Sequence, residues 1–567
     1  MVRRVRTLGR PAVLLPIGLF AFALLLRLIG VDWHGQHPDE DISGPARVLA
    51  GDLHLHSFYY PPLLTYLVAI GDVVLFALGL LLGWWHSTAE LRAAYFNDST
   101  PFFVTARVVV AICSAIAAPI AWALARQIRL PRTAALLAGL AAILSPGAIY
   151  FAHIAKSDSG LAPAYLLALL CALRMIERPS SLSRPIQLGI AVGLAVSFKQ
   201  SALFFLVPAF AFLVPWSLYE SSERPVLIRS WAVAIAASSI TAALLNIAIL
   251  ADPTPFLAAQ AVQSQMSFRP ASLQETMKTS YMQLVGPNVG LPVVALIVAP
   301  TLWMLGIVRG HSSVRLLLVV MGIGCAGASI IICSVGGSRQ PLQLWLPSVV
   351  LGVVAAAIGA GTLVGGSNRV LRVLGYAGFA VLVASTIVRI VPILTQATAP
   401  PLAARLATVI RRAAPPEAKI VSNVDLSPYL PLSPESQTLP RARHERLAKH
   451  YGIVLPPPDR PLTGIANGYT IIDFPWVIGG LEDYRPDQVK VVVPYAWPLQ
   501  PDEWQLSSWL DQGFHHFVVS DAARLRDNPV PAYRNLFRSI DQCVRIASVP
   551  ATRPLFGEHD AGIYRCD

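Results

Sequence analysis

Residues 11–30 read PAVLLPIGLFAFALLLRLIG, and the polar stretch QHPDEDISGP follows at residues 36–45. The first stretch is apolar over about twenty positions, which is the length that an α-helix needs to cross the hydrocarbon core of a bilayer. Acidic side chains cost free energy close to a bilayer, so the cluster Asp39-Glu40-Asp41 directly after a membrane span is expected to have a function. This junction predicts a membrane protein with a functional loop at the membrane surface.

The composition of the whole chain supports a membrane protein. Hydrophobic residues make up 54% of the 567 residues and charged residues 13%, whereas soluble domains carry about a quarter charged residues. The net charge is +12, but most basic residues lie in short loops between apolar runs. That distribution is typical of membrane topology signals and not of a basic groove for nucleic acid. We therefore expect a multi-pass protein of the cell membrane whose partners include membrane lipids but no nucleic acid.

The apolar runs set the number of membrane crossings. They lie at 11–30, 101–124, 133–151, 160–176, 186–198, 201–219, 231–250, 290–308, 315–334, 341–363 and 372–394. A further apolar run at 61–85 begins with Pro61-Pro62 and contains Asp72. If it does not span, the arginine clusters between the later runs all fall on the side of the basic N-terminus, as the positive-inside rule requires. We predict about eleven crossings, a cytoplasmic N-terminus, and a segment 61–85 that lies along the outer face or dips into it.

The composition changes after about residue 395, where long apolar runs end. Short strand-like stretches follow at 419–421, 470–472, 489–493 and 516–519, with helical patterns between them. We predict a polytopic α-helical transmembrane domain over residues 1–395 and a soluble α/β domain over residues 396–567 on the outer side of the membrane. Cys543 and Cys566 lie in this second part and could form a disulfide if the domain is exported.

The predicted external loops collect carboxylates and cations on one face of the membrane. The residues are Asp39, Glu40, Arg47 and Tyr60 in the first loop, Asp158 in the second, Lys199 in the next and Arg339 in the fifth. Carboxylates can activate a hydroxyl group, and lysine and arginine can hold a phosphate. This arrangement suits an anionic, membrane-embedded substrate that is approached from the outer leaflet. No metal-binding spacing is evident.

As an ordered set, the motifs resemble the lipid-carrier-dependent glycosyltransferases of the GT-C fold, which include the protein O-mannosyltransferases and the aminoarabinose transferase of lipid A. The set comprises His37-Pro38-Asp39-Glu40, the stretch FYYPPL at 58–63, Arg107, His153-x-x-Lys156-x-Asp158, Ser197-Phe198-Lys199 and Arg339. It covers most of residues 1–365. The resemblance implies that a sugar is moved from a polyprenyl-phosphate donor to a hydroxyl group of a lipid, a cell-envelope glycan or a protein.

The resemblance also implies roles for the carboxylates. Asp39 matches the family's general base, which takes the proton of the acceptor hydroxyl group. Glu40 is its partner in the motif, and Asp158 resembles a second aspartate of the catalytic site. Some members of the family use a divalent cation and others do not, so the resemblance leaves a metal cofactor open.

Four residues are candidates for the donor phosphate. Lys199, Arg47 and Arg339 are cations that match the family's pattern by position. Tyr60 stands where some relatives carry a lysine that contacts the phosphate, and this difference shifts the expected contact to Lys199.

Structural alternatives stay open for these residues. Asp158 lies in Ser157-Asp158-Ser159, which is a good helix N-cap sequence, and Lys199 could extend along the apolar surface to the membrane interface. Arg47 and Arg339 could be interface anchors, and we interpret His153 and Lys156 as such anchors. For the whole chain, the alternatives are a transporter or flippase of lipid-linked sugars and a non-catalytic envelope-assembly protein of the same fold. Transporters commonly show internal repeats, and we see none in this sequence.

Overall fold

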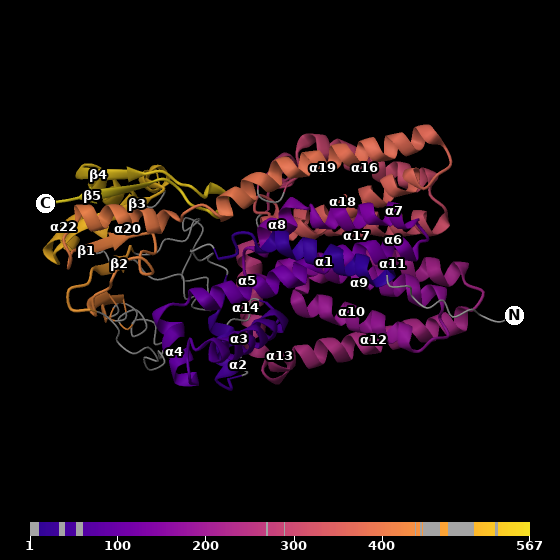
Figure 1. Cartoon of the computed structure of the whole chain (residues 1–567), viewed down its shortest axis with the longest axis horizontal. Coiled ribbons are helices and arrows are strands. Elements are labelled where there is room, and N and C mark those ends of the chain that lie inside the picture. Colours follow the sequence, from indigo (N-terminus) through magenta and orange to yellow (C-terminus); the bar gives the residue numbers. More distant parts are fainter. Residues whose placement is uncertain are drawn as a thin grey trace. The chain divides into compact units, whose positions relative to one another are not determined.

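The computed structural model describes most of the chain as two compact units (Figure 1). The described residues are 11–32, 40–52, 60–267, 270–287, 290–436, 438–440, 442, 445, 465–474, 504–527 and 531–567. The first unit contains the described residues up to Leu82 together with Phe102–Thr395. The second contains Gly83–Pro101 and the described residues from Gln396 onward. Asp39 and the predicted strand at 489–493 lie outside the described residues.

Helices are the only regular secondary structure in the described residues of the first unit. Its helices are α1 (Pro11–Leu28), α2 (Ser43–Leu49), α3 (Leu63–Leu82), α5 (Thr100–Ala115), α6 (Ala117–Gln127), α7 (Arg132–Ile143), α8 (Pro146–Ala152), η1 (Ser157–Gly160), α9 (Leu161–Glu177), α10 (Ser183–Phe198), η2 (Gln200–Ala202), α11 (Leu203–Glu220), α12 (Arg224–Leu245), α13 (Ile247–Ala251), α14 (Pro253–Ser267), α15 (Leu273–Val285), α16 (Val293–Arg309), α17 (Ser312–Gly336), α18 (Leu342–Val364) and α19 (Arg369–Ala397). Many of them, such as α1, α9 and α12, run along the length of this unit (Figure 1).

The lengths and compositions of these helices confirm a multi-pass membrane protein. Within the described residues, 8 helices are long and apolar enough to cross a membrane, or 9 if the bent pair α7 and α8 forms one span. The described part of the structure also contains three shorter apolar helices, α1, α10 and α16. The sequence predicted all three as spans. The pair α7 and α8 bends by 47° at Pro146, because proline lacks the N–H that a continuous helix needs.

Helix α3 occupies the apolar run that we predicted to lie along the outer face. The structure makes it one helix of 20 residues, and its length and hydropathy are those of a candidate span. Its ribbon lies at one end of the first unit, close to α2 (Figure 1). Length and composition do not distinguish the two placements, so a surface position for α3 stays a prediction.

Small residues let the central helices of the first unit pack closely. Helices α9 and α18 are the most buried candidate spans, with 78% and 83% of their apolar windows covered by protein. A Cβ atom on Gly359 of α18 would lie 2.0 Å from the carbonyl oxygen of Leu302 on α16, so only glycine allows this approach. The N-terminus of α9, and with it the turn η1, is therefore surrounded by protein and does not face lipid.

The second unit is an α/β domain, as the sequence predicted. Its strands are β1 (Lys419–Ser422), β2 (Thr470–Asp473), β3 (Phe514–Ser520), β4 (Val544–Val549) and β5 (Ala561–Arg565), and they form a 5-stranded sheet in the order β2-β1-β3-β5-β4. Strands β2, β1 and β3 are parallel, whereas β5 is antiparallel to both β3 and β4. The sequence interpretation did not predict β4 and β5.

Helices cover this sheet with two apolar clusters. The helices are α20 (Leu402–Ala413), α22 (Leu506–Asp511), α23 (Ala522–Arg526) and α24 (Pro531–Asp541), and this unit also contains α4 (Thr88–Asn97). Leu406 and Ile410 of α20 pack in one cluster, and Trp509 and Phe537 pack in the other. A disulfide joins Cys543 to Cys566, a pairing that the sequence left open, and ties the start of β4 to the end of β5.

Candidate functional site

The centre of the candidate site is a buried ion pair between Asp158 and Lys199. The Lys199 ammonium donates to Oδ1 of Asp158 over 2.6 Å, and the side chains are 7% and 0% exposed for the lysine and the aspartate. The second carboxylate oxygen, Oδ2, is buried and has no hydrogen-bond partner among the described residues. A buried acceptor without a partner is unusual in a folded protein, so this oxygen is available to a polar ligand.

Local sequence explains how these two residues are held. Asp158 lies in the 3-10 turn η1 between α8 and α9, and Lys199 follows the last residue of α10 with an extended backbone. A Cβ on Gly160 would lie 2.7 Å from the Phe198 ring, so the glycine lets this ring pack on the turn. The N-cap interpretation of Asp158 is wrong in this structure, because its described hydrogen bond goes to Lys199 and the side chain caps no helix.

A second buried ion pair joins Glu40 to Arg107 of α5. Arg107 donates from Nε to Oε1 and from Nη2 to Oε2 of Glu40, each over 2.8 Å, and both side chains are almost fully buried. The backbone N–H of Ala155 donates to the same Oε1 over 2.8 Å. Glu40, the residue after Asp39, is thus bound both to α5 and to the segment that leads to Asp158.

His153 connects the same segment to the end of α1. One ring nitrogen lies 2.8 Å from the carbonyl oxygen of Ile149, and the other lies 2.7 Å from that of Ile29. Its side chain is fully buried, and Lys156 is 3% exposed. The interpretation of both residues as interfacial anchors is therefore wrong, because neither presents its side chain at the protein surface. Residues 153–158 instead link the end of α1, the first loop and the end of α10.

Tyr60 lies against Lys199. The Lys199 ammonium is 4.8 Å from the centre of the Tyr60 ring, which is within the range of a cation–π interaction. Tyr60 occupies the position where some relatives carry a lysine. It contacts Lys199, the cation that we expected to bind the phosphate in place of that lysine. It leaves one face of the ammonium covered by an aromatic ring and one donor directed at Asp158.

The other predicted residues have different positions. Arg47 is an exposed residue of α2, and Arg339 is an exposed residue of the turn between α17 and α18. The structure thus brings Asp158, Lys199 and Tyr60 together and links Glu40 to the neighbouring segment. Neither arginine shares the burial of this group.

The described residues do not fit a divalent cation. No three His, Cys, Asp or Glu side chains come together in the part of the chain that the structure describes. Both oxygens of Glu40 accept from Arg107, and Asp158 is paired with Lys199. Of the four carboxylate oxygens, only Oδ2 of Asp158 is left without a described partner, and one oxygen is too few for a divalent cation, so we derive no step through a metal.

Arg27 is a buried cation that the sequence interpretation missed. Arg27 of α1 is 0% exposed and donates to Ser114 Oγ over 2.9 Å and to the carbonyl oxygens of Ala23 and Ala142. These contacts tie α1 to α5 and α7. An arginine inside an apolar run is the sequence signal that could have identified it, since such residues usually face the protein interior.

One family of known proteins matches part of the chain. The family described as dolichyl-phosphate-mannose-protein mannosyltransferase matches residues 99–249. That segment contains Arg107, Asp158 and Lys199. Together with the multi-pass helical fold, the match confirms the resemblance to the GT-C class of membrane glycosyltransferases. No curated protein matches the chain.

Three solved structures are similar to the chain at a distance. ArnT from Cupriavidus metallidurans bound to undecaprenyl phosphate is 14% identical with a TM-score of 0.48, and the match covers 98% of each chain. The S. cerevisiae protein O-mannosyltransferase Pmt1-Pmt2 complex bound to the sugar donor is 17% identical with a TM-score of 0.31, over 42% of this chain and 34% of that one. The Archaeoglobus fulgidus oligosaccharyltransferase in complex with Zn and sulfate is 12% identical with a TM-score of 0.43, over 92% of this chain and 67% of that one.

Proposed function

We propose that this protein is a membrane glycosyltransferase that moves a sugar from a polyprenyl phosphate to a hydroxyl group outside the cytoplasm. The observation that carries the proposal is the buried Lys199–Asp158 pair, which offers a cation and a carboxylate oxygen without a described partner at the end of two membrane helices. The family match over residues 99–249 supports the same class of reaction.

The reaction needs a base, an anion site and an oriented sugar. Asp39 takes the proton of the acceptor hydroxyl group, whose oxygen attacks the anomeric carbon of the donor. The bond between that carbon and the phosphate oxygen breaks, and the polyprenyl phosphate leaves with the bonding electrons. Because phosphate is a good leaving group, orientation contributes more to the rate than the strength of the base.

Lys199 stabilises the phosphate as it leaves. An ammonium has three donors, and Asp158 uses one of them, so the others can reach a phosphate oxygen. Asp158 holds the ammonium in place, and its Oδ2 accepts a hydrogen bond from a hydroxyl group of the sugar. Arg47 and Arg339 are exposed and are therefore assigned an auxiliary role, in which they attract the anionic headgroup.

Glu40 acts through position. Two bonds from Arg107 and one from Ala155 occupy its carboxylate, so it does not exchange a proton with the substrate. It holds the chain at Asp39, the adjacent residue, and thereby places the base. The acceptor is a lipid, a cell-envelope glycan or a protein, and the second unit lies on the outer side of the membrane with the acceptor.

The test is turnover of a panel of radiolabelled polyprenyl-phosphate sugars by the purified protein. Wild type is expected to release polyprenyl phosphate or to transfer the sugar, and Asp39→Asn is expected to lose this activity at unchanged expression. Asp41→Asn is the matched control, because Asp41 belongs to the same acidic cluster but its Oδ1, which asparagine retains, accepts hydrogen bonds from Ser43 and Gly44 at the start of α2. Turnover by Asp39→Asn at the wild-type rate, or none with any donor, would overturn the proposal and favour a transporter or an assembly protein.

A further inference from the structure

The sheet of the second unit contains a topological switch point. Strands β2, β1 and β3 are parallel and adjacent in that order, so the chain leaves β1 toward one side and later returns on its other side. The connection after β1 leads to β2 on one side, and the connection after β3 leads to β4 and β5 on the other side. The two connections therefore diverge at the carboxyl ends of β1 and β3. In open α/β sheets, ligands bind outside the carboxyl ends of the strands at this point.

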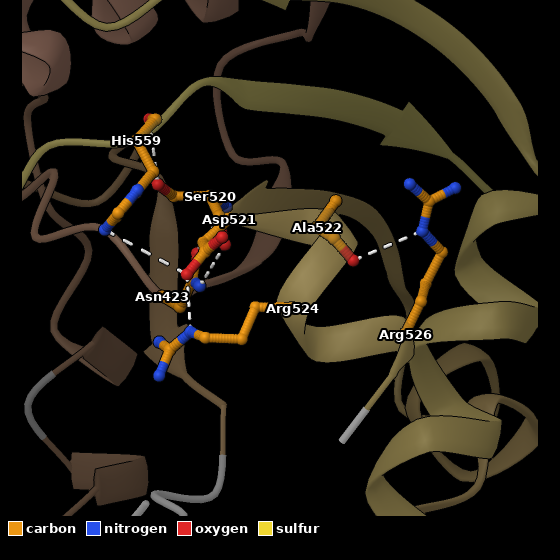
Figure 2. A network of polar contacts seen from close by, with 7 residues as sticks. All are labelled: Asn423, Ser520, Asp521, Ala522, Arg524, Arg526 and His559. Carbon is orange, nitrogen blue, oxygen red and sulfur yellow. Dashed lines mark hydrogen bonds and ion pairs between the residues drawn. The ribbon is translucent and has the colours of Figure 1, made fainter. Parts of the chain in front are cut away.

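Polar residues gather at this edge of the sheet (Figure 2). Asn423 directly follows β1, and Asp521 directly follows β3. Strand β5 is antiparallel to β3 and pairs its first residue, Ala561, with Ser520, so His559 also lies at this edge. Arg524 reaches the group from the short helix α23.

Hydrogen bonds fix the base of this group. The Asn423 side chain donates to the carbonyl oxygen of Ser520 over 2.8 Å, and its Oδ1 accepts from the Ser520 N–H over 2.7 Å. Ser520 Oγ donates to the carbonyl oxygen of His559 over 3.0 Å. Three segments that are distant in sequence are therefore held together without help from the outer side chains.

The outer side chains keep unused hydrogen-bonding capacity. Asp521 has a left-handed backbone with φ of 57°, and its Oδ2 accepts from Arg524 Nε and lies 4.0 Å from His559 Nε2. The side chains of Arg524 and His559 are 72% and 57% exposed, and that of Asp521 is 19% exposed. Among the described residues, Oδ1 of Asp521 and the two terminal nitrogens of Arg524 have no further hydrogen bond.

The chemistry of these three side chains selects a class of ligand. One carboxylate, one guanidinium and one imidazole offer both acceptors and donors with little net charge. A phosphate ligand would be repelled by the carboxylate, and a divalent cation would need further acidic ligands. A sugar hydroxyl group both donates and accepts, so neighbouring hydroxyl groups match a carboxylate beside a guanidinium.

We propose that the carboxyl ends of β1 and β3 form a carbohydrate-binding site, in which Asp521 accepts from sugar hydroxyl groups and Arg524 and His559 donate to them. This site is separate from the Lys199–Asp158 pair, and the inference goes beyond the proposed transfer reaction. It gives the second unit a function of its own, which is to hold a glycan outside the membrane.

The test is saturation-transfer NMR with the full-length protein in detergent and a panel of neutral methyl glycosides of hexoses and pentoses. Glycerol serves as the probe for non-specific polyol binding, and inorganic phosphate serves as a competitor. Asp521→Asn removes the charge but keeps the backbone, because asparagine also tolerates the left-handed region. Asp541→Asn is the matched control, because Asp541 forms a comparably exposed ion pair with Arg526 away from this edge.

Wild type and Asp541→Asn are expected to bind at least one methyl glycoside saturably, and Asp521→Asn is expected to weaken that binding at least tenfold. A polyprenyl phosphate, which would occupy the transfer site, should not compete, which separates this site from the transfer site and makes its result independent of the proposed function. Equal binding by wild type and Asp521→Asn would overturn the proposal. So would competition by polyprenyl phosphate or by inorganic phosphate, or no binding above glycerol.

Discussion

Lys199 Nζ lies 2.6 Å from Asp158 Oδ1 in a buried environment, although the two residues are 41 positions apart in the sequence. The lysine follows α10 and the aspartate precedes α9, so each stands at a helix end and not within an apolar run. A buried charge without its partner is costly, and this makes the pair interdependent. The same interdependence keeps a cation in place before any anionic substrate arrives.

Removal of one charge of this pair should lower the stability of the protein more than removal of both. Lys199→Met leaves the Asp158 carboxylate buried without a cation, which is expected to cost about 3–5 kcal/mol of stability. The double variant Lys199→Met with Asp158→Asn should recover part of that loss, because no uncompensated charge remains. Thermal unfolding of the four proteins in one detergent measures the coupling.

The exposed pair of Lys419 and Glu435 provides the control for this cycle. Its side chains are 36% and 56% exposed, so Lys419→Met should change stability by less than about 1 kcal/mol. Strictly additive effects of the two single substitutions at 158 and 199 would contradict the coupling.

Arg107 should determine the rate through Glu40. Lysine keeps the charge but cannot make the two parallel hydrogen bonds that arginine makes, so Arg107→Lys releases part of the grip on Glu40. We expect kcat to fall about tenfold or more while the KM for the donor changes little, since the proposed base is misplaced and the proposed phosphate site is intact. Steady-state kinetics with a donor from the panel that wild type turns over measures both constants.

Arg129→Lys is the matched control for Arg107, because Arg129 forms an exposed and longer ion pair with Glu177 at 3.9 Å. It should behave as wild type. A rise in KM with unchanged kcat in Arg107→Lys would show that Glu40 supports donor binding and not the base.

The sequence was a better guide to which polar residues to consider than to the residues that they contact. Apolar runs predicted the membrane helices, and the ordered motifs singled out Asp158 and Lys199, which form a buried ion pair. The Glu40–Arg107 contact joins residues 67 positions apart and depends on how α5 packs, which no local pattern reports. His153 was misinterpreted for the same reason, because a histidine at a helix end has the same local sequence whether it faces lipid or the carbonyl oxygen of Ile29.

In the second unit, His516 should make stability depend on pH. Burial lowers the pKa of this histidine, and nearby His515 and Arg565 lower it further. The unfolded chain then binds a proton at higher pH than the folded chain, starting near the ordinary value of about 6.5. Stability should therefore be complete above that value and fall as the pH drops below it.

Hydrogen exchange of β3 at pH 7.5 and pH 5, corrected for the intrinsic rates, measures this effect. Wild type is expected to lose protection at the lower pH, and His516→Gln is expected to lose less, because its side chain does not take up a proton. An equal loss in both proteins would assign the acid sensitivity to other groups.

Gly160 should control the geometry of the Lys199–Asp158 pair through its contact with Phe198. A methyl group at this position would lie 2.7 Å from the ring of Phe198, so the ring must move, and Lys199 is the next residue. Overpacking of this kind costs about 1–3 kcal/mol, and a shift of about 1 Å at a reacting centre can cost about a hundredfold in rate. Gly160→Ala is therefore expected to lower activity much more than stability, as measured by donor turnover and thermal unfolding of the same preparation.

Phe198→Leu in the Gly160→Ala background should restore part of the activity, because a smaller side chain makes room for the methyl group. Gly18→Ala on α1, where a Cβ would meet nothing within 4 Å, should leave turnover unchanged. If Phe198→Leu fails to rescue while the protein remains folded, the contact between Gly160 and Phe198 does not set the position of Lys199.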